Sequence, residues 1–199
     1  APFLAELLQS CPGLRILATS TAPLRLRAEQ RYRVPPLALA PSVDLFLHHA
    51  HAVDPDFVLT PERAGAVAEI CLHLDGLPLA IELAAAHMDI LDPHTMLERI
   101  RERRLALLAD GSSDLPAHQR SLRTAIERSY GLLNHDEQRL FRALGVFVGG
   151  WRMDAVVALG SDEQMLRSLL NKSLVHRAPV DRDEQRFQML PILCEFALE

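Results

Sequence analysis

Lysine is almost absent from this sequence, which has 21 basic residues among 199 and a single lysine, Lys172. A P-loop holds nucleotide phosphates with a glycine-rich turn followed by lysine, because backbone amides surround the phosphates while the ammonium group reaches the β and γ oxygens. No glycine occurs in residues 161–171, directly before Lys172. The chain therefore contains no P-loop, and we expect no ATPase activity from it alone.

Aromatic residues and long apolar runs are also scarce. Aromatics make up 5% of the chain, against 49% hydrophobic residues rich in Ala and Leu, and this balance favours helices. No uncharged apolar run reaches about 18 residues, so we expect no membrane span, and the first residues lack the basic start of a signal peptide. The few cysteines are far apart and predict reduced thiols in a cytoplasmic protein: Cys11, Cys71 and Cys194.

An excess of positive charge is the third absence. The net charge is −5, acids outnumber bases in residues 1–114, and the two balance in residues 115–199. Proteins that bind the phosphate backbone of nucleic acids need a surface rich in Lys and Arg. We therefore expect no direct contact with nucleic acid.

Residues 1–40 have the pattern of an incomplete α/β unit. Residues 3–8 are apolar at helical spacing, and Cys11-Pro12-Gly13 ends that helix. Residues 14–20 form a short apolar run that is typical of a buried parallel strand. One helix and one strand cannot bury their own faces, so this region is predicted to be the C-terminal remnant of a larger α/β nucleotide-binding domain.

Two helical regions follow. Residues 41–112 predict a bundle of four short helices, whose starts carry a cap residue or a proline: Ser42, Thr60-Pro61, Pro78 and Asp92-Pro93. Residues 109–119 are rich in Gly, Ser, Pro and Asp and predict a linker. Residues 113–199 predict four helices, a β-hairpin around residues 180–185 and a last helix, which together suggest a winged helix-turn-helix domain. The predicted fold class is therefore mainly α.

The stretch HLDGLPLAIELAA at residues 73–85 resembles the GLPLA motif of STAND-type ATPases of the NB-ARC class. Four further blocks resemble the same family in the same order: LRILATSTAPLRL, RYRVPPLAL, SLRTAIERSYGLLNHDEQRLFRALGVFVGGW, and LLNKSLV with RFQMLPILCEFALE. The resemblance covers essentially the whole chain. It is greatest to large bacterial transcriptional regulators of the LuxR-like or SARP-like kind, which carry a separate DNA-binding domain.

The resemblance implies a nucleotide-dependent switch. In the family, ADP or ATP (with Mg²⁺) lies between an upstream P-loop domain, a helical domain and a winged helix. The implied partners are that P-loop domain, an effector or DNA-binding domain, and repeat sensor domains of the full-length protein. The implied nucleotide-binding residues are those of the motif and of the sensor strand, where hydroxyls face the phosphate end: Gly76, Leu77, Pro78, Leu79, Thr19 and Ser20.

Two positions depart from the family. Thr21 stands where an arginine usually senses the terminal phosphate, a role that Arg25 or Arg27 would have to fill. Pro191, in Met189-Leu190-Pro191, stands where the winged helix usually offers His or Glu. Because neither Thr21 nor Pro191 carries a charge, we expect tight nucleotide binding and at most slow hydrolysis in the full-length protein.

Blander interpretations remain open beside this one. Gly76 to Pro78 could form a simple turn between helices, and Thr19 and Ser20 could cap the end of a strand. His48 and His51 share a helix face but lack a third ligand, and Cys71 and His73 point to different faces, so we predict neither a metal site nor a catalytic residue.

Two other functions also stay open. One is a protein-interaction scaffold that needs no nucleotide. The other is a DNA-binding winged-helix repressor. The acidic residues on its expected DNA-contacting elements, the recognition helix and the hairpin turn, argue against it: Asp162, Glu163, Asp181, Asp183 and Glu184. The basic residues on the same elements are Arg167, Lys172 and Arg182.

Overall fold

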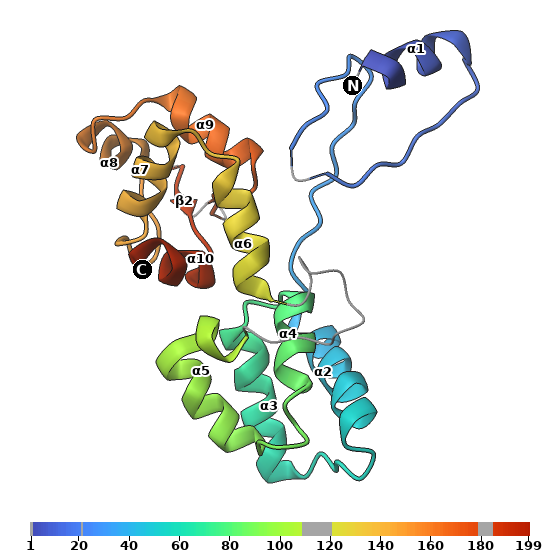
Figure 1. The fold of residues 1–199 in the computed structure, drawn as a ribbon, viewed down its shortest axis with the longest axis vertical. Coiled ribbons are helices and arrows are strands. Elements are labelled where there is room, and N and C mark those ends of the chain that lie inside the picture. The colour runs from blue at the N-terminus through green and yellow to red at the C-terminus, as the bar shows by residue number, and fades with distance from the viewer. Residues whose placement is uncertain (1, 21, 109–120, 179–184) are drawn as a thin grey trace.

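The structure is a computed structural model that describes residues 2–20, 22–108, 121–178 and 185–199. The described residues are mainly helical, as predicted, and their one sheet has two short strands (Figure 1). The linker expected at residues 109–119, Thr21, and the wing residues 181–184 lie outside the described ranges. None of the described helices is long and apolar enough to cross a membrane.

The first body is a bundle of four helices, α2 (Leu39–Val53), α3 (Pro61–His73), α4 (Pro78–Ala85) and α5 (Pro93–Leu107). Helix α2 packs on α3 and α4, and α3 packs on α5. Their apolar faces form a core that includes Phe46, Val67, Ile70, Ile81, Met96 and Ile100. The bundle predicted from the helical periodicity is therefore present.

Helix starts follow the predicted signals with one exception. The Thr60 side chain accepts a hydrogen bond from the Arg63 N–H, and the Asp92 side chain accepts from His94 and Thr95, so both are N-caps. Ser42, however, is not a cap. Helix α2 begins at Leu39, so Ser42 lies inside the helix, buried, with its hydroxyl 3.5 Å from the Leu37 carbonyl oxygen. The prediction was wrong because a proline in the first helical turn costs no hydrogen bond, so Pro41 does not delay the start.

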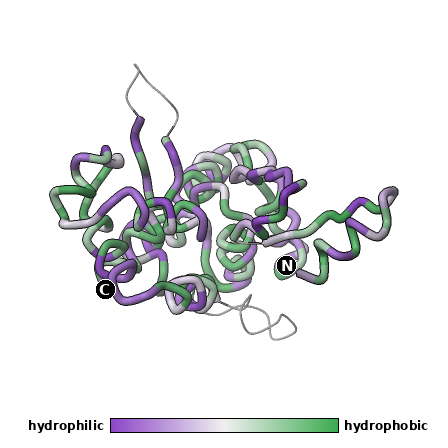
Figure 2. Tube along the Cα trace, turned by 90° about the horizontal axis from the view of Figure 1, so that it is seen from above, coloured by the Kyte–Doolittle hydropathy of each residue, from purple (hydrophilic) through white to green (hydrophobic). Residues whose placement is uncertain are grey.

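The second body contains α6 (Leu122–Gly131), α7 (His135–Leu144), α8 (Met153–Ala158), α9 (Glu163–Asn171) and α10 (Pro191–Leu198). Helix α7 packs on α9 and α10, and its buried residues Phe141 and Leu144 lie in the core of this body. Strands β1 (His176–Arg177) and β2 (Phe187–Gln188) pair antiparallel, as the hairpin pattern predicted. The described ends of this hairpin project from the body and are largely hydrophilic (Figure 2). The order of helices and hairpin is that of the winged helix that we predicted.

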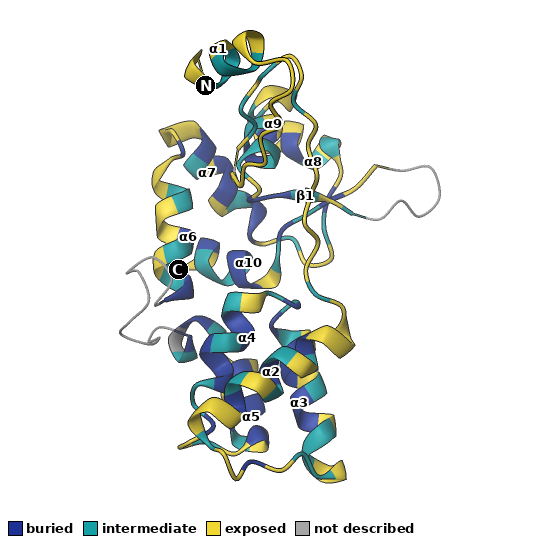
Figure 3. Ribbon diagram, turned by 90° about the vertical axis from the view of Figure 1, so that its right-hand side faces the viewer, coloured by how far each residue is buried: buried dark blue, intermediate teal, exposed yellow. Residues whose placement is uncertain are grey.

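The first described residues, 2–20, lie apart from both bodies (Figure 1). Helix α1 (Pro2–Ser10) forms as predicted but buries no residue (Figures 1 and 3). The predicted strand at residues 14–20 does not form: the segment is exposed, and Leu17 is 100% exposed. A strand needs a neighbour for its hydrogen bonds, and the described residues offer none beside this segment.

The last residues before α2 touch both bodies. The Leu37 N–H donates to the Gly76 carbonyl oxygen at 2.9 Å in the first body. The Arg33 guanidinium donates to the Val175 carbonyl oxygen, just before β1, at 3.5 Å in the second body. Residues 33–37 therefore link the two bodies along a path separate from the chain between α5 and α6.

Candidate functional site

The turn between α3 and α4 is built from two residues with left-handed backbone conformation. Helix α3 ends at His73, and Asp75 (φ 56°) and Gly76 (φ 63°) then reverse the chain. The Gly76 N–H donates to the Cys71 carbonyl oxygen, which closes the end of α3. Pro78 is the first residue of α4, where its missing N–H costs no helical hydrogen bond.

Gly76 is required here by close contact as well as by conformation. A Cβ atom at this position would collide with the carbonyl oxygen of Leu37. The hydrogen bond from the Leu37 N–H to the Gly76 carbonyl oxygen holds the two backbones in this close contact. The turn therefore binds the segment that leads into α2. The role of Gly76 in shaping the turn, which the resemblance implied, therefore has a physical cause in this structure.

The residues after Gly76 divide between the core and the surface. Leu77 and Leu79 are partly buried and pack against the core, whereas Pro78 is exposed. The proline ring is thus a rigid apolar surface at the start of α4 that a ligand or a neighbouring domain can reach. Gly76 and Leu77 thus lie in the turn, and Pro78 and Leu79 begin α4 directly after it.

Thr19 and Ser20 do not join this turn. Both are exposed, and the Ser20 hydroxyl forms hydrogen bonds only with the backbone of Ala22 among the described residues. Figure 1 places residues 14–20 beside α1, away from α4. Their predicted place at the phosphate end of a nucleotide stays a prediction.

A cavity of about 440 Å³ lies between residues 23–31 and helix α9. It is lined by Pro23, Arg25, Leu26, Glu29, Arg31, Arg167 and Asn171. The Glu29 carboxylate accepts hydrogen bonds from the backbone N–H groups of residues 24–26, which fixes this loop. Arg25 therefore faces a basic cavity, while Arg27, the other candidate to replace an arginine at position 21, does not line it.

Pro191 begins helix α10 and is exposed, between buried Met189 and the helix interior. It lacks both a charge and an N–H, so it offers a phosphate nothing to bind. Its place in the structure is instead that of a helix start, as for Pro78 in α4.

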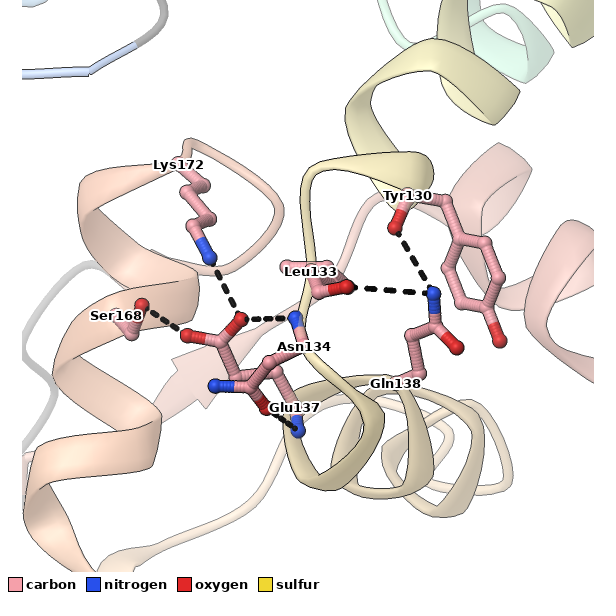
Figure 4. A network of polar contacts seen from close by, with 7 residues as sticks. All are labelled: Tyr130, Leu133, Asn134, Glu137, Gln138, Ser168 and Lys172. Carbon is pink, nitrogen blue, oxygen red and sulfur yellow. Dashed lines mark hydrogen bonds and ion pairs between the residues drawn. The ribbon is translucent and has the colours of Figure 1, made fainter.

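A buried polar network joins α7 to α9 (Figure 4). Glu137, only 6% exposed, accepts hydrogen bonds from the Lys172 ammonium group at 2.6 Å, the Ser168 hydroxyl at 2.5 Å and the Asn134 N–H at 2.8 Å. Burial alone would raise the pKa of Glu137, but these hydrogen bonds lower it below its ordinary value. The only lysine in the sequence is thus paired with a buried carboxylate of its own domain.

Sequence analysis missed the ion pair of Lys172 with Glu137. There Lys172 counts only among the basic residues of the elements that would contact DNA in a repressor. Glu137 stands three residues after Asn134, and together they form the capping box of α7. That spacing could have identified the cap, but only the packing of α9 on α7 shows that Lys172 reaches the same carboxylate.

Other candidate reactive groups are separated. Within the described residues, no three side chains among His, Cys, Asp and Glu are placed to hold a metal ion. Cys71 is buried, and burial raises the pKa of its thiol to about 11, which leaves very little thiolate at neutral pH. The described residues therefore show no activated cysteine nucleophile at Cys71.

Comparison with known proteins gives one consistent result. No family model matches the chain. The chain is 39% identical, over 208 aligned residues, to a putative HTH-type transcriptional regulator of Mycobacterium bovis and to one of Mycobacterium tuberculosis, and each alignment covers 100% of this chain but 23% of the relative. It is also 40% identical, over 165 residues, to an uncharacterized protein of Mycobacterium tuberculosis, covering 82% of this chain and 42% of that protein.

These relatives agree with the predicted similarity to bacterial transcriptional regulators. The chain spans about a quarter of the length of the named regulators, so their activity as whole proteins is not assigned to it. The similarity to NB-ARC ATPases stays a prediction.

Proposed function

We propose that this chain is the regulatory part of a nucleotide-dependent switch in a bacterial transcriptional regulator. Its helical and winged-helix domains, residues 41–112 and 113–199, would close over ADP or ATP held by an upstream P-loop domain. Exchange of the nucleotide would then change how the domains pack and release an effector or DNA-binding domain. The similarity to regulators several times longer than this chain supports its place as one part of such a protein.

The turn at residues 75–78 is the observation that carries this proposal. Its backbone is held by the Leu37 hydrogen bond and by the close contact at Gly76, so its shape is preorganised. The exposed Pro78 ring stands on this rigid turn and offers a flat apolar surface to an adenine or a ribose. A preorganised turn loses little conformational entropy when a ligand binds, which favours affinity.

The phosphate end would belong to the N-terminal segment and the upstream domain. Thr19 and Ser20 lie in the chain just before residues 23–31. Those residues line the cavity to which Arg25, Arg31 and Arg167 contribute. Neither Arg25 nor Arg31 has an acidic ion-pair partner among the described residues, so both guanidinium groups are available to an anion. Mg²⁺ would enter with ATP in the full-length protein, since these residues provide no metal site.

A DNA-binding repressor is less well supported by the charges on α9. Arg167 forms an ion pair with Glu163 on the same helix, and Lys172 forms one with Glu137 on α7. Asp162 caps the helix with its side chain. The described part of α9 therefore presents little free positive charge, and salt-dependent binding of duplex DNA by this chain would contradict our proposal.

The proposal is tested by titrating ADP calorimetrically into the full-length protein, with Pro78→Glu compared against Pro61→Glu. Both prolines are exposed first residues of a helix, so the two variants differ only in their place. We expect Pro78→Glu to weaken ADP binding at least tenfold, about 1.4 kcal/mol, while Pro61→Glu binds like the wild type. Equal binding by both variants, or no binding by the wild type, would favour the nucleotide-independent scaffold.

A further inference from the structure

The candidate turn also lies at the junction between the two bodies. Asp75, the residue before Gly76, has its carboxylate oxygen Oδ2 3.8 Å from Nη1 of Arg104 on α5. That oxygen is buried and accepts no hydrogen bond from the described residues. Arg104 instead donates from Nη1 to the His73 carbonyl oxygen at 3.0 Å. Among the described residues, the buried oxygen thus has one distant counter-charge and no hydrogen-bond donor.

Helix α10 of the second body closes the other side of this junction. Helix α5 packs on α10, and the Leu105 N–H donates to Oε1 of Glu195 at 3.2 Å. The neighbouring Cys194 is close enough to sense both charges: burial raises the pKa of its thiol, Asp75 raises it further, and Arg104 opposes this. The turn, α5 and α10 therefore meet around Asp75.

We propose that Asp75 is a positioning residue that couples the Gly76–Pro78 turn to α10, and that its protonation tightens the docking of the winged-helix domain on the helical bundle. The regulatory meaning of this coupling rests on the proposed function, because it presumes a ligand at the turn. The coupling itself requires no ligand and can be tested without one.

The physical reason is the cost of a poorly solvated carboxylate. Burial raises the pKa of Asp75 from 3.8 to about 6, and the Arg104 charge only partly opposes this. Among the described residues, the charge that acts on Asp75 is that of Arg104 from α5. From α10, the titratable group that interacts with Asp75 is the Cys194 thiol, while Glu195 binds the Leu105 N–H and His73 ends the helix before Asp75. The C-terminal end of α3, with its partial negative charge, also disfavours an anion at this position.

The sign of the pH dependence follows from this. A raised pKa means that the docked state binds the proton more tightly than a state in which Asp75 is hydrated. Docking is therefore strongest below about pH 4, weakens as the pH rises from there through about 6, and levels off at higher pH. By linkage, a ligand that needs the docked domains would bind with the same pH dependence.

The backbone connects this proton to the turn. Asp75 and Gly76 both have positive φ and are adjacent in the turn, so a rotation of the turn backbone at Asp75 would carry its side chain along. A ligand that presses on Pro78 would thus move the carboxylate relative to Arg104. This is the physical path by which one site would affect the other.

The test follows amide hydrogen exchange of Leu105 and of α10 in the 199-residue chain from pH 5 to pH 8, corrected for intrinsic rates. In the wild type we expect protection to fall about tenfold between pH 5 and pH 8, with most of the fall complete by pH 7, because only the upper part of the shift from 3.8 to about 6 lies in this range. Asp75→Asn, which imitates the protonated acid, should keep high protection at every pH. Asp89→Asn removes an exposed carboxylate beyond α4 and should behave like the wild type.

A flat profile in the wild type, or the same pH-dependent profile in Asp75→Asn, would overturn the proposal. So would a loss of the pH dependence in Asp89→Asn. If Asp75→Asn unfolds, Arg104→Met provides the second variant: it removes the counter-charge, and protection should then fall further at pH 8 but recover at pH 5. The hydrogen-exchange test contains no nucleotide, so a negative result in it does not contradict the proposed nucleotide binding at Pro78. Likewise, a negative ADP titration does not contradict the coupling through Asp75.

Discussion

Replacing Lys172 by methionine is the sharpest test of how the winged-helix body is held together. The substitution keeps the aliphatic stem of the side chain but leaves the Glu137 carboxylate, 6% exposed, without its counter-charge. Breaking a buried ion pair from one side costs about 3–5 kcal/mol. Lys172 itself is about a quarter exposed and Ser168 and Asn134 still donate to Glu137, so we expect about 2–3 kcal/mol.

The loss is measured by urea unfolding followed through the fluorescence of Trp151. This is the only tryptophan in the sequence, and it is buried in the same body, where it pairs with Phe187. The matched control is Arg167→Met on the same helix, which breaks an ion pair with Glu163 whose side chains are 69% and 70% exposed. Exposed pairs contribute little, so the control should change stability by less than about 0.5 kcal/mol.

The pH dependence adds a second check. The pKa of Glu137 is lowered in the folded wild type, so its ion pair stabilises the protein above the unfolded value of 4.5, and that stability is lost as the pH falls through the lower folded value. In Lys172→Met the uncompensated burial should raise this pKa. The destabilisation should therefore be largest at neutral pH and shrink toward pH 4. Equal losses for the Lys172 and Arg167 variants would refute the reasoning.

Two further predictions concern the turn and the thiols. Gly76→Ala should destabilise the bundle by about 2–4 kcal/mol in urea unfolding, because alanine at positive φ is strained and its Cβ meets the Leu37 carbonyl oxygen. Gly65→Ala, inside α3 with nothing near its new Cβ, should instead stabilise by about 0.5–1 kcal/mol; a similar effect at both glycines would contradict this account. In Ellman titration at pH 8, exposed Cys11 should react at once and Cys71 only on unfolding, since about one Cys71 thiol in a thousand is ionised there. Rapid reaction of Cys71 in the folded protein would show that its burial is misjudged.

Much of the helical fold could be predicted from local signals. Caps and prolines at Thr60, Pro78 and Asp92 mark helix starts because they satisfy or remove the unpaired N–H groups of a first turn. The strand at residues 14–20 could not be predicted correctly from its composition, because a strand depends on a partner that no local pattern supplies. Helix starts can be predicted from a few neighbouring residues. A strand forms only if a neighbouring strand pairs with it, and a local pattern does not contain that information.

The candidate site shows the same division. Gly76 and Pro78 are visible in the sequence because their conformational properties are intrinsic. The exposure of Pro78, the contact of Gly76 with Leu37, and the position of Asp75 beside Arg104 arise from packing between segments distant in the chain. The proposed coupling residue therefore escaped sequence analysis although it directly precedes the motif.

The two hydrogen bonds at Arg33 and Leu37 have a mechanical consequence. They attach residues 33–37 to the two bodies. The backbone between Arg33 and Leu37 spans at most about 14 Å, and the Arg33 side chain adds its own length. Two prolines between these residues, Pro35 and Pro36, restrict the backbone, so this segment is stiffer than an ordinary flexible linker. The segment therefore limits how far the two bodies can separate before the Arg33 hydrogen bond breaks.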